Sequence, residues 1–190
     1  MAAARLVPDP WTGSVTDRVV VGDRVLVDIS FRAARARLRM LAGDGVLLGA
    51  SEEAYGEGIT GLVQLAGPTA GQTRLAGVSL DNLAEADHCA HIALRWEAIA
   101  ADGGLFAALD ADLMLVPAGD LTTALALAGA YRPQPGPGGA GLDRAIVRRC
   151  AAAVTRRFVA RVACALVHPA GVAGPAGRGA PRRPPGDDKP

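Results

Sequence analysis

Aromatic residues and lysine are scarce in this chain of 190 residues. Phe, Trp and Tyr make up 4% of it, and Lys189 is the only lysine, so arginine supplies the other 19 of the 20 basic residues. The formal net charge is +1. So few aromatics exclude an extensive base-stacking surface, and so small a net charge excludes a strong field that would steer nucleic acid. We therefore expect no nucleic-acid partner.

Long apolar runs are also missing, although hydrophobic residues make up 50% of the chain. No unbroken run reaches the roughly 18 residues that a bilayer crossing requires. The first residues, MAAARLVPDPWTG, lack the apolar core of a secretory signal. We expect no membrane span and a cytoplasmic location. A chain of this length can bury about 70% of its unfolded surface in one domain.

The three cysteines, Cys89, Cys150 and Cys164, include no C-x-x-C pair. On one helix, Cys150 and Cys164 would lie about 21 Å apart and could not form a disulfide. We expect reduced, mostly buried thiols.

Sequence signatures of catalysis and of metal binding are absent or incomplete. There is no G-x-S-x-G, no phosphate-binding P-loop and no G-x-G-x-x-G. His88, Cys89 and His91 are close in sequence, but a zinc site needs about four ligands, and the only other histidine is His168. We expect no metal and no cofactor, and we assign no catalytic residue.

The distribution of apolar and turn residues predicts one folded domain over residues 18–168. A flexible leader, residues 1–17, precedes it. A Pro/Gly-rich tail, residues 169–190, follows and has too few large aliphatic residues to order itself. Residues 19–30 alternate as a strand, and residues 31–42 have helical spacing, with Ser30 as N-cap and Gly43 as the stop.

A short second helix is predicted over residues 46–53. Further strands are predicted over residues 58–65, 73–83, 90–100, 105–117 and 121–131, and a final helix over residues 141–167. Short turns between the strands favour antiparallel hairpins. The predicted order is β-α-α-β-β-β-β-β-α, an α+β fold.

Charged residues on two predicted strands suggest acid–base chemistry at first sight. Arg95 and Glu97 lie on one strand, and Asp110 and Asp112 on the next. Strand alternation places all four opposite the large aliphatic residues of the same strands. We therefore expect them to face solvent as cross-strand ion pairs, each worth less than about 1 kcal/mol.

The predicted final helix carries an apolar stripe together with many arginines. Because the arginines are spread around more than one face, we expect their alkyl stems to pack along the edges of the stripe and their heads to reach solvent. The six arginines are Arg144, Arg148, Arg149, Arg156, Arg157 and Arg161.

The order of elements resembles the START/polyketide-cyclase-like (SRPBCC) superfamily, whose fold is called helix-grip. The matching segments are LRWE (residues 94–97), ALDADLMLVP (108–117), ALAGAYRP (126–133) and GLDR (141–144), which opens the last helix. The resemblance covers roughly residues 24–167. It implies a curved sheet wrapped around the last helix, and a cavity between them for a lipophilic small molecule.

Combined with strand alternation, the resemblance predicts a mostly aliphatic cavity wall with a tyrosine hydroxyl at each of two strand ends. The predicted cavity residues are Tyr55, Leu94, Trp96, Leu113, Leu115, Leu125, Leu127, Tyr131, Ile146, Cys150, Val154 and Phe158.

Three functions remain open at this stage. The first is binding or sequestration of an apolar small molecule. The second is a cyclase/dehydratase-type enzyme in which Tyr55, Tyr131 or Arg95 guides the substrate. The third is an interaction protein with a filled core and no ligand. Arg95 and Glu97 lining the cavity would favour the enzyme, whereas Leu94 and Trp96 lining it would favour the binder.

Overall fold

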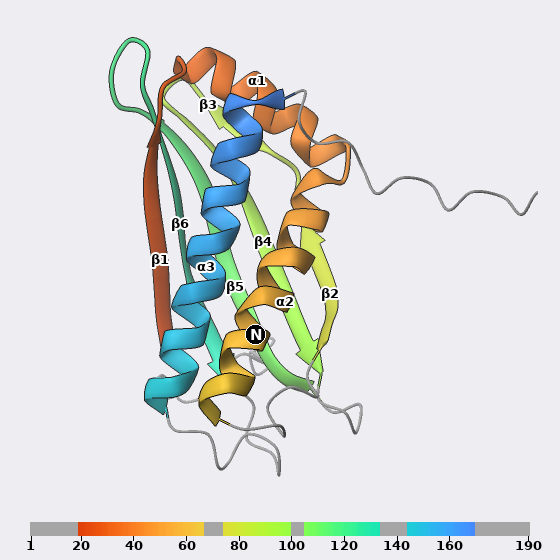
Figure 1. Ribbon diagram of the computed structural model, residues 1–190. Coiled ribbons are helices and arrows are strands. Elements are labelled where there is room, and N and C mark those ends of the chain that lie inside the picture. Colours follow the sequence, from red (N-terminus) through yellow and green to blue (C-terminus); the bar gives the residue numbers. More distant parts are fainter. Residues whose placement is uncertain (1–18, 67–73, 100–104, 134–143, 170–190) are drawn as a thin grey trace, which may run out of the picture.

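A six-stranded antiparallel sheet forms one layer of the molecule, and the helices lie against one of its faces (Figure 1). The computed structural model describes residues 19–66, 74–99, 105–133 and 144–169. Along the sheet the strands follow the order β1 (Val19–Val27), β6 (Thr123–Pro133), β5 (Leu105–Pro117), β4 (Cys89–Ile99) and β2 (Arg74–Leu80). The short β3 (Ala84–Ala86) also pairs with β4.

Three helices make up the second layer: α1 (Phe31–Gly43), α2 (Val46–Ala66) and α3 (Arg144–Val167). The Ser30 hydroxyl accepts a hydrogen bond from the Ala33 amide at 3.4 Å, so Ser30 is the predicted N-cap of α1. Gly45 has a φ of 73° and turns the chain between α1 and α2, a conformation that favours glycine. Helix α3 runs beside α2 along the length of the sheet (Figure 1).

This arrangement is the helix-grip fold, so the predicted α+β class is confirmed. The prediction of a short second helix is wrong, because α2 has 21 residues and includes residues 58–65, which were predicted as a strand. Leu47, Ser51, Ala54, Tyr55 and Gly58 are all buried, at the spacing of one helical face. Four glycines lower the helix propensity of α2, and packing against α3 outweighs that loss.

The remaining elements match their predictions to within a few residues. The predicted strand over residues 73–83 ends earlier, at Leu80, and β3 follows it. The order of helices and strands is still the predicted one, because β3 is an additional strand and residues 58–65, predicted as a strand, belong to α2. The predicted leader and all but the first residue of the predicted tail lie outside the described residues.

The core lies between the sheet and the helices. Trp96 of β4 meets Phe158 of α3 edge to face, with ring centroids 5.2 Å apart. A single apolar cluster joins these rings to β1, β5, β6, α1 and α2. Its largest fully buried members include Leu38, Leu47, Ile92, Leu113, Leu115, Leu125, Leu127 and Leu166.

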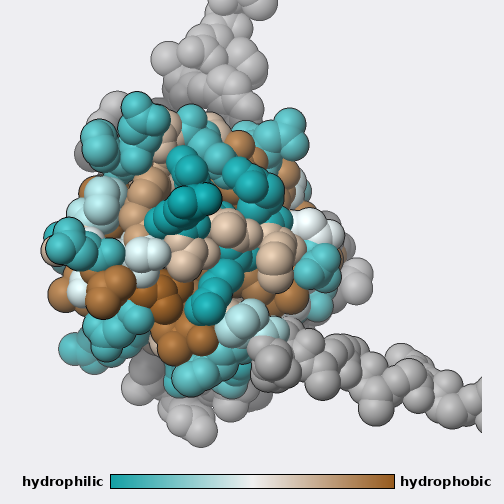
Figure 2. All heavy atoms as spheres, turned by 90° about the horizontal axis from the view of Figure 1, so that it is seen from above, coloured by the Kyte–Doolittle hydropathy of each residue, from teal (hydrophilic) through white to brown (hydrophobic). Residues whose placement is uncertain are grey.

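Arg37 of α1 ties the end of α3 to the rest of the fold. Its guanidinium donates hydrogen bonds to the carbonyl oxygens of Leu166 at 2.5 Å and Val167 at 3.4 Å, which the helix itself leaves without amide partners. Figure 2 views the molecule from above, at the α1 end, where hydrophilic and hydrophobic side chains are interspersed. Among the helices of the described segments, none combines the length and apolarity needed to cross a membrane.

Candidate functional site

The predicted inner wall of the sheet faces the helices. Leu94 and Trp96 of β4 are 3% and 4% exposed and belong to the core cluster, whereas Arg95 and Glu97 between and beside them are half-buried on the other face. The predicted direction of this strand is therefore confirmed. On β5, β6 and α3, the predicted wall residues Leu113, Leu115, Leu125, Leu127, Val154 and Phe158 are buried in the same cluster.

Around Trp96 this wall is packed by other side chains. Trp96 Nε1 donates to the Ser51 hydroxyl at 3.1 Å, and Ser51 in turn donates to the Leu47 carbonyl at 2.7 Å. The ring of Phe158 covers the indole. The polar atoms of this region thus satisfy one another. Ile146, which was also predicted in the wall, lies outside the part of α3 whose side chains are described.

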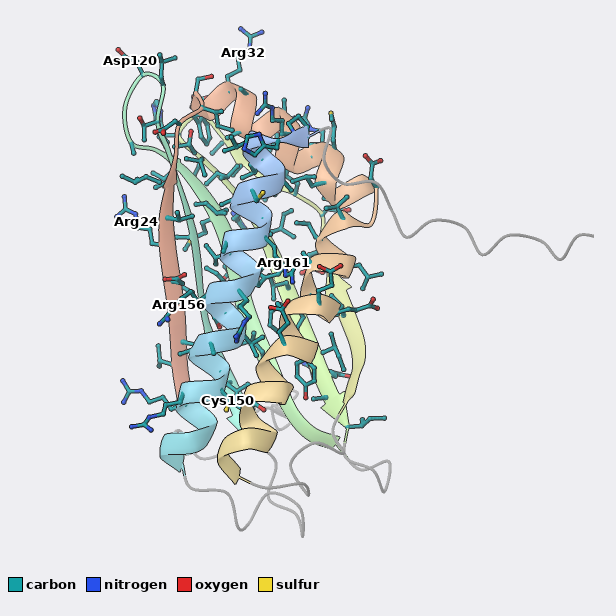
Figure 3. All side chains as sticks on the ribbon, viewed as in Figure 1. Arg24, Arg32, Asp120, Cys150, Arg156 and Arg161 are labelled. Carbon is teal, nitrogen blue, oxygen red and sulfur yellow. The ribbon has the colours of Figure 1, made fainter. Side chains whose placement is uncertain are left out.

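Three polar side chains from three elements also share the interior. They are Tyr55 of α2, which is 7% exposed, Tyr131 of β6 and Cys150 of α3, which are partly buried. Tyr131 is paired in register with Val19 of β1 and Leu109 of β5, both buried, so its ring faces inward. Cys150 lies near the start of α3 (Figure 3).

Burial keeps the Tyr131 hydroxyl and the Cys150 thiol protonated. Burial raises the pKa of the Tyr131 hydroxyl well above its ordinary value, and the neighbouring Tyr55 and Cys150 raise it further. Burial also raises the pKa of the Cys150 thiol. Both groups are therefore neutral near pH 7. A neutral phenol donates one hydrogen bond and accepts others, but a phenol with a raised pKa is a poor general base.

Thr155 of α3 adds a fourth polar group, one that was not predicted from the sequence. Its side chain is 1% exposed, and its hydroxyl has no hydrogen-bond partner among the described residues. Leaving a buried hydroxyl unpaired costs about 1–3 kcal/mol. Its spacing could have indicated this burial, because Thr155 lies four residues from both Ala151 and Val159, which are buried on the same face of α3. We call Tyr55, Tyr131, Cys150 and Thr155 the neutral polar set.

Charged side chains gather on the opposite, outer face of the sheet. Arg95 Nε lies 2.8 Å from Glu97 Oε1, and Arg95 Nη1 lies 3.6 Å from Asp110 Oδ1. Arg132 also pairs with Asp110. The predicted cross-strand pairing is confirmed for Arg95 and Asp110, whereas Arg95 and Glu97 pair within β4. Arg95 does not line the interior.

A groove of about 360 Å³ crosses this outer face. Its small residues Ala93 and Ala128 stand on either side of Asp112 in the cross-strand register. Asp81 and Arg95 contribute to its rim. The groove arises because alanines on neighbouring strands leave room between the longer charged side chains.

Two of the arginines of α3 pair with α2 rather than with the strand acids. Arg161 contacts Glu53 at 2.6 Å and Glu57 at 2.5 Å, and Arg157 contacts Glu57 at 3.2 Å. Figure 3 shows Arg161 directed toward α2, and Arg156 on the other side of the helix, toward β1. As predicted, the described arginines flank the apolar stripe.

No group of three or more potential metal-ligating side chains occurs within the described segments. Cys89 is half-buried, and His88 and His91 are exposed.

No protein-family model and no curated protein sequence matches this chain. Several solved structures are similar to it at low identity. A hypothetical protein from Helicobacter pylori aligns with a TM-score of 0.38 and 10% identity, over 84% of this chain and 98% of that chain. The Zhui aromatase/cyclase from Streptomyces aligns with a TM-score of 0.35 and 12% identity, over 82% of this chain and 99% of that chain.

Norcoclaurine synthase from Thalictrum flavum, in complex with dopamine and hydroxybenzaldehyde, aligns with a TM-score of 0.34 and 11% identity. The alignment covers 84% of this chain and 96% of that chain. Similarity at this level does not extend to a ligand or a reaction. The fold of the chain follows from its own topology.

Proposed function

We propose that this chain binds a lipophilic small molecule between the sheet and helices α2 and α3. The observation that supports this most is the neutral polar set, four hydrogen-bonding side chains inside a mostly apolar layer. Burying such groups costs stability that aliphatic residues would not. A ligand that accepts a hydrogen bond from Thr155, whose hydroxyl has no partner among the described residues, would recover part of that cost.

The proposed site of binding is the part of the layer around the neutral polar set. There Tyr55, Tyr131 and Cys150 come from the three elements that enclose the interior. In the same cross-strand row as Tyr131, Trp96 already bonds to Ser51 and packs against Phe158. The aliphatic wall that the sequence predicted supplies the apolar surroundings of the ligand.

The enzyme alternative loses one of its three candidate residues, because Arg95 is on the outer face. Tyr55 and Tyr131 are suited to hold a ligand as hydrogen-bond donors. Binding is therefore the function that the geometry supports better.

The first experiment titrates the purified chain with Nile red, an uncharged lipophilic dye, and measures the fluorescence of the dye. The second is native mass spectrometry of protein isolated from its own host. We expect saturable one-to-one dye binding and a co-purifying apolar compound. The variant Arg95→Ala, altered on the outer face, should bind the dye as the wild type does. A folded protein that binds no dye and carries no compound would instead support an interaction protein with a filled core.

A further inference from the structure

We infer that a second copy of this chain pairs along the edge of β1, so that the two sheets join into one across a twofold axis. Strand β1 is an end strand of the sheet, and among the described residues it pairs only with β6. In an end strand, every second residue directs its amide and carbonyl away from the sheet, where another strand can pair with them. The inference concerns a different surface from the proposed ligand site and does not depend on it.

The edge of β1 lacks most of the features by which proteins prevent such pairing. Its sequence, VVVGDRVLV, contains no proline and no lysine, and its nine residues exceed the usual length of a strand. Val20 and Leu26 lie on the outer face and are 79% and 58% exposed. Exposed aliphatic side chains on a long end strand favour association with another strand.

The order of residues in β1 indicates that the strand fits a second copy of itself. Valine or leucine occupies the second, third and fourth positions on either side of Asp23. A second copy that runs antiparallel, with Asp23 at the centre, therefore places Val20 opposite Leu26 and every other aliphatic residue of β1 opposite an aliphatic residue. Gly22 lies opposite Arg24 in this register, so the longest side chain faces the residue without one.

A twofold axis perpendicular to the joined sheet produces this register. Rotation about such an axis reverses the direction of the strand and keeps both inner faces on the same side, so α3 of each copy still covers its own β1. The side chains of Val20 and Leu26 then meet in two equivalent pairs, one on each side of the axis. The same residues thus form both halves of an isologous interface.

The unfavourable feature of this register is that Asp23 lies opposite Asp23 of the second copy. Like charges directly opposite each other destabilise a strand pair. Asp23 is half-buried and shares the inner face with Val21 and Val25, which is the face that α3 covers. Arg156 of α3 is directed toward β1 (Figure 3) and takes no part in the ion pairs between α3 and α2. Each copy therefore brings one arginine and one carboxylate to the axis, and the arginines offset the repulsion.

Sedimentation velocity of the full chain, at concentrations from about 1 μM to about 1 mM, tests the inference. We expect a reversible dimer with twice the mass of the 19.3 kDa chain. The dimer should be weak, because pairing two strands buries less surface than a permanent interface does.

Charged substitutions at the edge test the register. Val20→Lys and Leu26→Glu each place a charge opposite an aliphatic side chain, so each should raise the dissociation constant at least about tenfold. The double variant V20K/L26E places opposite charges across both pairs and should dimerise at least about threefold more tightly than either single variant. Arg156→Ala should weaken the dimer by about twofold to fivefold, because it removes the charge that offsets the two carboxylates.

Val116→Lys is the matched control. Val116 lies on the same outer face and is 42% exposed, but it belongs to β5, which is paired on both sides. This variant should keep the wild-type dissociation constant. Because Val20 and Leu26 are exposed, their variants should keep the wild-type circular dichroism spectrum, which shows that a weaker dimer does not result from unfolding.

A wild type that stays monomeric at about 1 mM would overturn the inference and leave the edge to a strand of a different protein. A dimer that Val116→Lys weakens as much as Val20→Lys does would place the contact on the outer face, which also overturns it. A double variant that dimerises no more tightly than either single variant would exclude this register, and the inference with it.

Discussion

On the inner face of the sheet the buried polar side chains are few and uncharged, whereas on the outer face they are charged and paired. Strand β5 contains both patterns in one stretch. Leu109, Ala111 and Leu113 are buried against the helices, while Asp110 and Asp112 between them point outward. Because successive side chains of a strand alternate in direction, one of two neighbouring residues faces the protein interior and the other faces water. Position within the strand thus decides whether a polar group is buried among apolar side chains or paired at the surface.

We expect the largest difference in stability between a substitution at the centre of the inner layer and one on the outer face. Phe158→Ala should lower the free energy of unfolding by about 3–5 kcal/mol, because it opens a cavity where the ring covers Trp96. Asp112→Ala on the outer face should change it by no more than about 0.5 kcal/mol. Urea denaturation followed by circular dichroism measures both. Similar losses in the two variants would show that the outer face contributes as much as the core.

A second contrast lies within α2. A methyl group at Gly58 would overlap Cγ2 of Val154, a β-branched side chain with little rotameric freedom in a helix. Gly58→Ala should therefore destabilise the protein by about 1–3 kcal/mol through overpacking between α2 and α3. Gly49→Ala is the matched control, since nothing lies within 4 Å of its added methyl group, and it should stabilise α2 by up to about 1 kcal/mol. A loss of stability in both variants would mean that backbone freedom, and not close packing, requires the glycines.

The third contrast concerns proton binding. In the unfolded chain Tyr131 loses its proton near pH 10, whereas burial raises the pKa of the folded-state hydroxyl above that value. Above pH 10 the unfolded state therefore binds fewer protons than the folded state, and stability falls by at most about 1.4 kcal/mol per pH unit. Below that pH this contribution is fully present.

Tyr131→Phe should consequently flatten the loss of stability between pH 10 and 11 while running parallel to the wild type between pH 7 and 9. Thermal unfolding midpoints across this range are the measurement. A wild-type slope retained in the variant would assign the alkaline loss to other groups.

Much of this contrast between faces could be predicted from the sequence. Alternation in residues 90–100 and 105–117 was sufficient to place Leu94 and Trp96 inward and Arg95 and Asp110 outward. The period-2 signal was strong because both strands are buried on one face and solvated on the other.

The full length of helix α2 could not be predicted from the sequence, because the helix depends on contacts with residues that are distant in the chain. Glycines at 49, 56, 58 and 61 reduce helix propensity, so the local pattern of residues 58–65 resembled a strand. The helix exists because Gly58 allows close approach to Val154, a contact distant in sequence. The hydrogen bond between Trp96 and Ser51 also joins residues 45 positions apart. The inward direction of Tyr131 likewise depends on pairing with β1 and β5.

The smallest expected effect is at the ion pairs of Arg95. With about a third of its side chain exposed, Arg95 contacts Glu97 and Asp110 through solvent-screened pairs, so Arg95→Ala should cost no more than about 1 kcal/mol. The cost should shrink as sodium chloride is raised from 0.05 to about 1 M, where the Debye length falls to about 3 Å. Asp110 also pairs with Arg132, so it keeps a counter-charge in this variant. Urea denaturation at both salt concentrations tests this, and Phe158→Ala measured alongside should show no comparable salt dependence. A loss that persists in 1 M salt would mean that the aliphatic stem of Arg95, rather than its charge, stabilises the outer face.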